Sequence, residues 1–193
     1  LSALRATRNR DGVQVAIERA VAVSRDAARL EELARIALAE SLPVAAERAF
    51  SARVEVAPDS LEARRWLGLL AAGRNDTAAA REHLGHYVVA GGRDPEALLR
   101  HGELLEREGR VEAARRAFAL GLDASARADR HSVAARRTHA FLLAHAGRAA
   151  DAQRDLETLV AEQPADVHLR ADYAAWLLKE GRHADAQRIL ALR

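Results

Sequence analysis

Three stretches share one pattern and decide the fold: EGRVEAARRAF at 108–118, AGRAADAQRDL at 146–156 and EGRHADAQRIL at 180–190. Each begins with a Gly-Arg pair after its first residue, has a central alanine, and carries a Phe or Leu four positions after that alanine. Two weaker copies, VAAERAF at 44–50 and AAAREHL at 78–84, precede them. The anchoring alanines of the five copies are Ala46, Ala80, Ala114, Ala152 and Ala186. The chain is therefore built from an internal repeat.

The repeat has a period of 34 residues. Consecutive alanines are 34 positions apart except between Ala114 and Ala152, where the spacing of 38 predicts a four-residue insertion near Asp129–Ser132. Apolar residues at spacings of three and four precede each Gly-Arg pair, which indicates a further helix. Glycine favours the position just past a helix C-terminus. Each repeat is therefore predicted to be a helix, a short turn at Gly109, Gly147 or Gly181, and a second helix.

Small residues in the first helices are expected to let the paired helices approach closely: Gly68, Gly102, Ala140 and Ala174. The large residues four positions after the anchoring alanines are expected to fill the space between neighbouring repeats: Phe50, Leu84, Phe118, Leu156 and Leu190.

Composition agrees with an all-α chain and excludes several classes of function. Only 4% of the 193 residues are aromatic, and the 49% that are hydrophobic include many alanines, which favours closely packed helices over a β-sandwich. Thirty basic and 28 acidic residues leave a formal charge of +2, which gives nucleic-acid binding no support. The absence of cysteine excludes disulfides, thiolate metal sites and cysteine nucleophiles. No apolar run approaches the roughly 18 residues that suggest a membrane span.

The repeat resembles the tetratricopeptide repeat. The resemblance rests on the 34-residue period, the Leu67–Gly68 pair, the Ala-x3-Phe pairs, and Pro58 and Pro164 at the ends of repeats. It implies an all-α, right-handed superhelical solenoid of about five stacked helix-turn-helix repeats. We place these repeats at 27–60, 61–94, 95–128, 133–166 and 167–193. Residues 1–26 are predicted to form a degenerate leading half-repeat with a helix from Val13 to Val23.

In this family the first helices of the repeats line a concave groove. Helical spacing places the following residues on the inward faces: Glu31, Arg35, Arg65, Trp66, Leu69, Leu99, Arg100, Glu103, Arg137, Thr138 and Phe141. Arginine forms paired hydrogen bonds with carboxylates, so the groove is expected to suit a partner protein or an acidic peptide. The alternative is that these arginines form exposed ion pairs with neighbouring acids. Trp66 either anchors a partner or covers a junction between repeats, whereas Tyr173 and Trp176 are expected in the core.

The sequence gives no indication of catalysis. His83 and His86 are three positions apart on a predicted helix, but zinc needs further ligands that the sequence does not place nearby. His101 and His139 are expected to be partly buried, and His131 exposed. There is no phosphate-binding glycine loop and no Gly-x-Ser-x-Gly motif. We therefore expect no metal, no cofactor and no enzymatic activity.

The leading functional hypothesis is a non-catalytic scaffold for protein binding. The Ala- and Arg-rich composition indicates a bacterial source and resembles periplasmic repeat domains of exopolysaccharide-export and envelope-assembly proteins. A third hypothesis is an accessory domain of a larger enzyme, because the chain begins with Leu1, contains no methionine and is expected to be a segment of a longer protein. The compartment is unknown, although the absence of cysteine favours the periplasm over the cytoplasm. Self-association through the uncapped last repeat, which ends after Leu190, is a further hypothesis.

Overall fold

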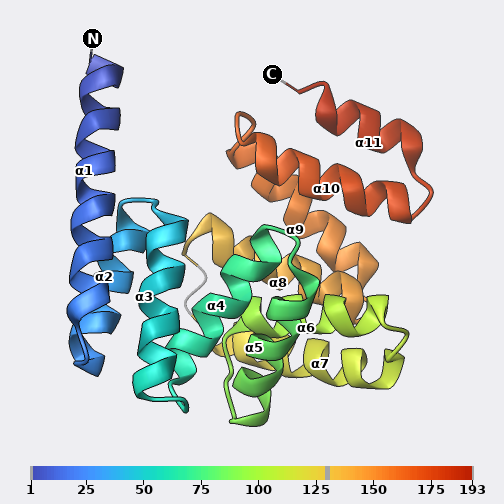
Figure 1. The fold of residues 1–193 in the computed structure, drawn as a ribbon. Helices are drawn as coiled ribbons and strands as arrows, with labels where there is room; N and C mark the ends of the chain where they lie inside the picture. The colour runs from blue at the N-terminus through green and yellow to red at the C-terminus, as the bar shows by residue number, and fades with distance from the viewer. Residues whose placement is uncertain (1, 129–130, 193) are drawn as a thin grey trace. The chain divides into compact units, whose positions relative to one another are not determined.

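The computed structural model describes residues 2–128 and 131–192, with side chains from residue 10 onward. In these residues there are eleven helices and no strand, so the all-α prediction is confirmed (Figure 1). The helices are α1 (Ser2–Val23), α2 (Ala27–Ala39), α3 (Pro43–Val56), α4 (Leu61–Gly73), α5 (Thr77–Val89), α6 (Pro95–Arg107), α7 (Val111–Arg127), α8 (Val133–His145), α9 (Ala149–Glu162), α10 (Val167–Lys179) and α11 (His183–Leu190).

The chain divides into two compact halves, residues 1–93 and 94–193, which we describe separately. The N-terminal half holds α1 to α5 and the C-terminal half holds α6 to α11. From α2 onward the helices pack in hairpins, one in each predicted repeat: α2 with α3, α4 with α5, α6 with α7, α8 with α9, and α10 with α11. The chain is therefore an all-α solenoid of helix-turn-helix pairs. Within residues 2–128 and 131–192, no helix combines the length and the apolar character that crossing a bilayer would require.

The first helix of every repeat ends in the same hydrogen-bonded turn. The residue after the C-cap has a positive φ, and the next N–H donates to a carbonyl five residues back, as from Arg148 to Leu143 over 2.9 Å. This is the Schellman motif, which favours glycine. Gly109, Gly147 and Gly181 occupy the position as predicted. In the N-terminal half the same position holds Ser41 and Asn75, which the sequence analysis did not identify as turn residues.

Side-chain caps define where the first helix of each of the five repeats begins. An Asp or Ser oxygen accepts the N–H of the third helical residue, which satisfies a donor that the helix itself leaves unpaired. These caps are Asp26, Ser60, Asp76, Asp94, Ser132 and Asp166. Five of the six precede the first helix of a repeat, and Asp76 precedes the second helix α5. The capping residues therefore set the helix boundaries locally, before any tertiary contact is considered.

Small residues let paired helices approach closely, as the sequence predicts. A Cβ added at Gly102 would overlap the Phe118 ring, and one at Gly68 would overlap Leu84. Phe118 and Leu84 are fully buried between helices. Leu190, which was expected to fill the corresponding space, is instead 54% exposed because no described helix packs on that side of α11.

The ends of the predicted segments differ from the observed helices in two places. The leading helix α1 begins at Ser2, well before the predicted Val13, and buries Ile17 and Val21 where it packs against α2 and α3. Part of the predicted insertion, residues 129 and 130, lies outside the described residues. Helix α7 has 17 residues where α5 has 13. The additional residues of this repeat therefore lengthen its second helix, α7.

Candidate functional site

A hollow opens on the first helices of the C-terminal half, and we call it the α6–α8–α10 groove. Its volume is about 320 Å³. It is lined by Arg100, Glu103 and Glu106 of α6, by Phe141, Ala144 and His145 of α8, by Asp172, Ala175, Trp176 and Lys179 of α10, and by the α10 C-cap residue Glu180. Three of the residues predicted to face inward, Arg100, Glu103 and Phe141, therefore line a hollow in this half.

The floor of the α6–α8–α10 groove is apolar. Phe141 is half-buried and packs against the cores on both sides of α8. Trp176 is 9% exposed and stacks on buried Tyr173 with ring centroids 5.9 Å apart, which confirms the expectation that both belong to the core. Ala144 and Ala175 have side chains too short to fill the space above this floor. The hollow exists because two aromatic residues are flanked by two alanines.

His145 forms one wall of the groove and was not singled out from the sequence. Its ring stacks on Phe118 with centroids 4.1 Å apart. Its Nδ1 lies 3.3 Å from a Glu106 carboxylate oxygen, and its Nε2 lies 3.9 Å from Glu103. The residue is the last of α8, and only the packing of α8 on α6 and α7 brings it to these partners.

The charged rim of the groove is partly paired. Arg100 donates to Glu103 over 3.0 Å, and Arg137 of α8 lies 3.3 Å from Asp172 of α10. Burial by itself would lower the pKa of the Arg100 guanidinium, but the Glu103 carboxylate outweighs this effect and raises the pKa above its usual value. Arg100 is therefore firmly cationic and neutralises Glu103.

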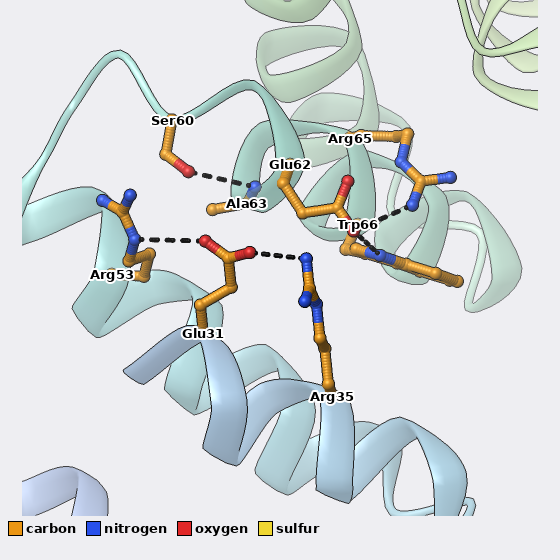
Figure 2. A network of polar contacts seen from close by, with 8 residues as sticks. All are labelled: Glu31, Arg35, Arg53, Ser60, Glu62, Ala63, Arg65 and Trp66. Atoms are coloured by element: carbon orange, nitrogen blue, oxygen red, sulfur yellow. Dashed lines mark hydrogen bonds and ion pairs between the residues drawn. The ribbon is translucent and has the colours of Figure 1, made fainter. Parts of the chain in front are cut away.

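In the N-terminal half, the first helices carry a closed polar network (Figure 2). Glu31 of α2 accepts a hydrogen bond from Arg35 at 2.6 Å and lies 3.7 Å from Arg53 of α3. In Figure 2, Arg35 reaches from α2 toward the Glu62 and Trp66 side chains of α4. The network therefore links three helices of this half.

Trp66 lies at the centre of the same network. Its Nε1 donates to Glu62 over 2.9 Å, and Glu62 also accepts from Arg65 at 3.0 Å. The Arg65 guanidinium stands 4.6 Å over the indole ring, and Phe50 of α3 stacks on that ring at 6.3 Å. Such stacking and cation–π contacts stabilise packing between helices. These are the contacts of a residue that covers the junction between two repeats.

The network also lowers the pKa of Glu62. Partial burial by itself would raise that pKa, but the hydrogen bonds and charge of Arg65, the Trp66 N–H and the charge of Arg35 outweigh burial. Glu62 is therefore anionic at neutral pH and is satisfied by groups of its own half.

The predicted groove residues fall into three sets. Glu31, Arg35, Arg65, Trp66 and Leu69 belong to the N-terminal half, and the first four form the closed network. Arg100, Glu103 and Phe141 line the α6–α8–α10 groove, and Arg137 pairs with the groove residue Asp172.

Two residues of the predicted set in this half, Leu99 and Thr138, do not line the α6–α8–α10 groove. Leu99 and Thr138 are only 2% and 6% exposed. Leu99 packs with Phe118 and Leu142 in the core. Expecting them on the inward surface was wrong, because the rotation of α6 and α8 about their own axes turns these positions toward neighbouring helices.

The histidines of the described residues do not form a metal site. No group of three or more histidine or acidic side chains in this part of the chain is placed to hold a metal ion. His83 Nδ1 instead lies 3.1 Å from the Arg64 guanidinium, and burial lowers its pKa. His101 and His139 are half-buried and His131 is exposed, as predicted. His139 Nδ1 lies 2.8 Å from the buried Ser125 hydroxyl.

Comparison with known proteins identifies the fold class. A tetratricopeptide repeat protein from Parabacteroides merdae ATCC 43184 aligns with a TM-score of 0.56 and 20% identity over 95% of this chain and 70% of its own. YrrB, described as a TPR protein with an unusual peptide-binding site, gives 0.51 and 13% over 90% and 88%. MamA from Desulfovibrio magneticus RS-1, residues 41 to the end, gives 0.51 and 13% over 84% and 90%. The chain therefore has the tetratricopeptide-repeat fold.

No protein-family model matches the sequence, and no curated protein matches it either. The likeness therefore lies in the backbone, at sequence identities of 20% or less in the structures above. The side chains of the groove must be interpreted from their own geometry.

Proposed function

We propose that this chain is a non-catalytic scaffold that binds a peptide segment of a partner protein in the α6–α8–α10 groove. The observation that carries the proposal is the hollow itself, with an aromatic floor of Phe141 and Trp176 inside a charged rim. Binding interfaces concentrate their energy in buried aromatic anchors surrounded by polar groups. A cavity of this size suits a few side chains of an extended or helical peptide rather than a whole domain.

The N-terminal half contributes less to this proposal. Glu31 is already paired with Arg35 on α2, and Glu62 with Arg65 on α4. Trp66 lies between Phe50 and Arg65. A ligand there would have to separate these pairs before it gained its own contacts. We therefore assign the binding site to α6, α8 and α10, and the network of α2 and α4 to the packing of its half.

The hypothesis of an acidic peptide rests on three of the arginines that were predicted on the inward faces: Arg65, Arg100 and Arg137. Each of them has a carboxylate of this chain beside it, at 3.0 Å from Glu62, 3.0 Å from Glu103 and 3.3 Å from Asp172. An acidic ligand would have to compete with these carboxylates. The geometry therefore supports a peptide ligand, but it gives little support to the idea that this peptide is acidic.

We also propose two biological contexts for this scaffold. The Ala- and Arg-rich composition, in which Lys179 is the only lysine, supports a repeat domain of a bacterial exopolysaccharide-export or envelope-assembly protein located in the periplasm. An accessory domain of a larger enzyme would use the same scaffold. The sequence of the complete gene separates these roles, because it shows which domains accompany the repeats.

Selection from a random peptide library tests the binding proposal. Ala144→Arg places a long side chain in the α6–α8–α10 groove, and Ala150→Arg places the same side chain on the exposed surface of α9 as a control. We expect selected peptides to lose at least about tenfold in affinity with Ala144→Arg and to bind Ala150→Arg unchanged. Circular dichroism verifies that both variants are folded. Equal binding to both variants, or a selection without specific peptides, would contradict the proposal.

A further inference from the structure

We propose that the α6–α8–α10 groove selects a cationic peptide segment, in which lysine or arginine residues flank an aromatic or aliphatic anchor. This inference rests on the proposed function and names the chemistry of its ligand. It reverses the charge of the partner that the arginine content of the sequence suggests.

The lining of the groove is acidic. Four carboxylates line it, against two cations, Arg100 and Lys179. The carboxylates are Glu103, Glu106, Asp172 and Glu180. Arg137, which lies outside the lining, pairs with Asp172 and compensates one further charge. With His145 left out of the count, four carboxylates against three cations leave the groove and its nearest partner with an excess of one negative charge.

Two of the four carboxylates account for this excess. Glu103 is held by Arg100 and Asp172 by Arg137, whereas within the described chain Glu106 and Glu180 form no ion pair with an arginine or lysine. Glu106 has the His145 imidazole at 3.3 Å. A ligand cation in the hollow could therefore pair with these two carboxylates without displacing an arginine from them.

The apolar floor adds a second preference for positive charge. A lysine or arginine side chain can lay its methylene groups along Phe141 and Trp176 while its charged end reaches the acidic rim. Aromatic rings also attract cations that lie over their faces. An acidic peptide, in contrast, would bring like charges to Glu106 and Glu180, and such contacts reduce affinity for the wrong partner. Floor and rim therefore favour the same ligand.

Three peptides with the same apolar residues test the inference. They carry lysine, glutamine or glutamate at otherwise identical positions, and fluorescence polarisation measures their affinities at low and high ionic strength. We expect the lysine peptide to bind about tenfold more tightly than the glutamine peptide, and the glutamate peptide more weakly than both. High salt should reduce the advantage of the lysine peptide, because it screens exposed charges.

Charge-neutralising variants locate the effect in the groove. Glu106→Gln combined with Glu180→Gln should weaken the lysine peptide by about fivefold and leave the glutamine peptide unchanged. Glu112→Gln is the matched control, because Glu112 lies on α7 outside the groove, is 74% exposed and pairs with Arg115. It should change neither affinity. The salt dependence of the wild-type chain tests the same charge preference without any variant.

The outcomes separate this inference from the proposed function. If the glutamine or glutamate peptide binds at least as tightly as the lysine peptide and loses affinity with Ala144→Arg, the groove binds peptides but does not select cations. An unchanged lysine preference in the Glu106→Gln, Glu180→Gln variant would also overturn the inference. If no peptide of the three binds and the library selection fails as well, both proposals fall together.

Discussion

Helices α4 and α10 carry the same repeat positions, yet these positions hold a paired polar network on α4 and line a hollow on α10. Leu69 of α4 and Ala175 of α10 occupy equivalent places in their repeats, as do Trp66 and Asp172. In the N-terminal half Trp66 lies over the junction between α3 and α4 and is paired with Glu62. In the C-terminal half Ala175 leaves the space open beside Trp176. The comparison teaches that the repeat defines the backbone, whereas the side chains decide whether equivalent positions pair with each other or line a hollow.

The pairing of acidic side chains also differs between these two regions. The network of α2 and α4 contains acids that are each held by an arginine. The rim of the α6–α8–α10 groove has acids beyond the number of its arginine and lysine partners. Paired polar groups stabilise a surface, whereas unpaired charges at a cavity are available to a ligand. The following predictions test this contrast, from the largest expected effect to the smallest.

Phe50→Ala and Phe118→Ala remove equivalent core residues from the two halves. Both side chains are fully buried, so each variant should lower the free energy of unfolding by about 3–5 kcal/mol. Only Phe118 supports His145 and the groove wall. Phe118→Ala should therefore also weaken the groove-binding peptide, whereas Phe50→Ala should leave its affinity unchanged.

The two tryptophans allow each half to be followed separately. Trp66 lies in the N-terminal half and Trp176 in the C-terminal half, and the chain has no third. Denaturant unfolding of single-tryptophan versions, monitored by fluorescence, should therefore assign each loss of stability to one half. Peptide affinity that falls equally in Phe50→Ala and Phe118→Ala would contradict the difference between the halves.

Glu62→Gln tests whether the closed network contributes to stability. A lowered pKa in the folded state means that the ionised form stabilises the fold at pH values above about 4.5, and that this contribution is lost as pH falls through the lowered pKa. Because Glu62 is about one-third exposed, solvent screening limits the effect to roughly 0.5–1 kcal/mol at neutral pH.

Unfolding free energies measured between neutral pH and about pH 3 examine this prediction. Wild type and Glu62→Gln should differ at neutral pH and converge in acid. The matched control Glu112→Gln, at an exposed pair, should differ little from wild type at any pH. A constant difference over the whole range would show that Glu62 acts through packing and not through its charge.

The turn residues give effects no larger than about 1 kcal/mol and distinguish the halves again. Gly147→Ala should lower the free energy of unfolding by about 1 kcal/mol, because alanine is strained at positive φ although the space around Gly147 is open. Ser41→Gly should raise it by about 0.5 kcal/mol, because glycine relieves that strain but loses more chain entropy on folding.

Asn75→Gly completes the series, with an expected change of only a few tenths of a kcal/mol because asparagine tolerates the left-handed conformation. Thermal or denaturant unfolding measures all three variants. A stabilising Gly147→Ala would show that the turn does not constrain the backbone as described.

The sequence determined the elements of this protein, because they depend on local chemistry. The 34-residue period, the alanine anchors and the turn glycines predicted the helix pairs, and the small residues Gly68 and Gly102 predicted close helix contacts. The turns at Ser41 and Asn75 were not predicted, because Gly and Pro are much stronger turn signals than Ser or Asn alone.

The tertiary structure alone decided the candidate site. Helical spacing placed Leu99 and Thr138 on the inward face, but the rotation of each helix depends on what packs behind it, and both are buried. The stack of His145 on Phe118 and the pairing of Arg137 with Asp172 join residues from different helices. The groove likewise depends on the summed volumes of side chains from α6, α8 and α10. Both the volumes and the ion pairs involve residues that are distant in the chain. Only the packed helices therefore show which carboxylates of the groove have no arginine or lysine partner.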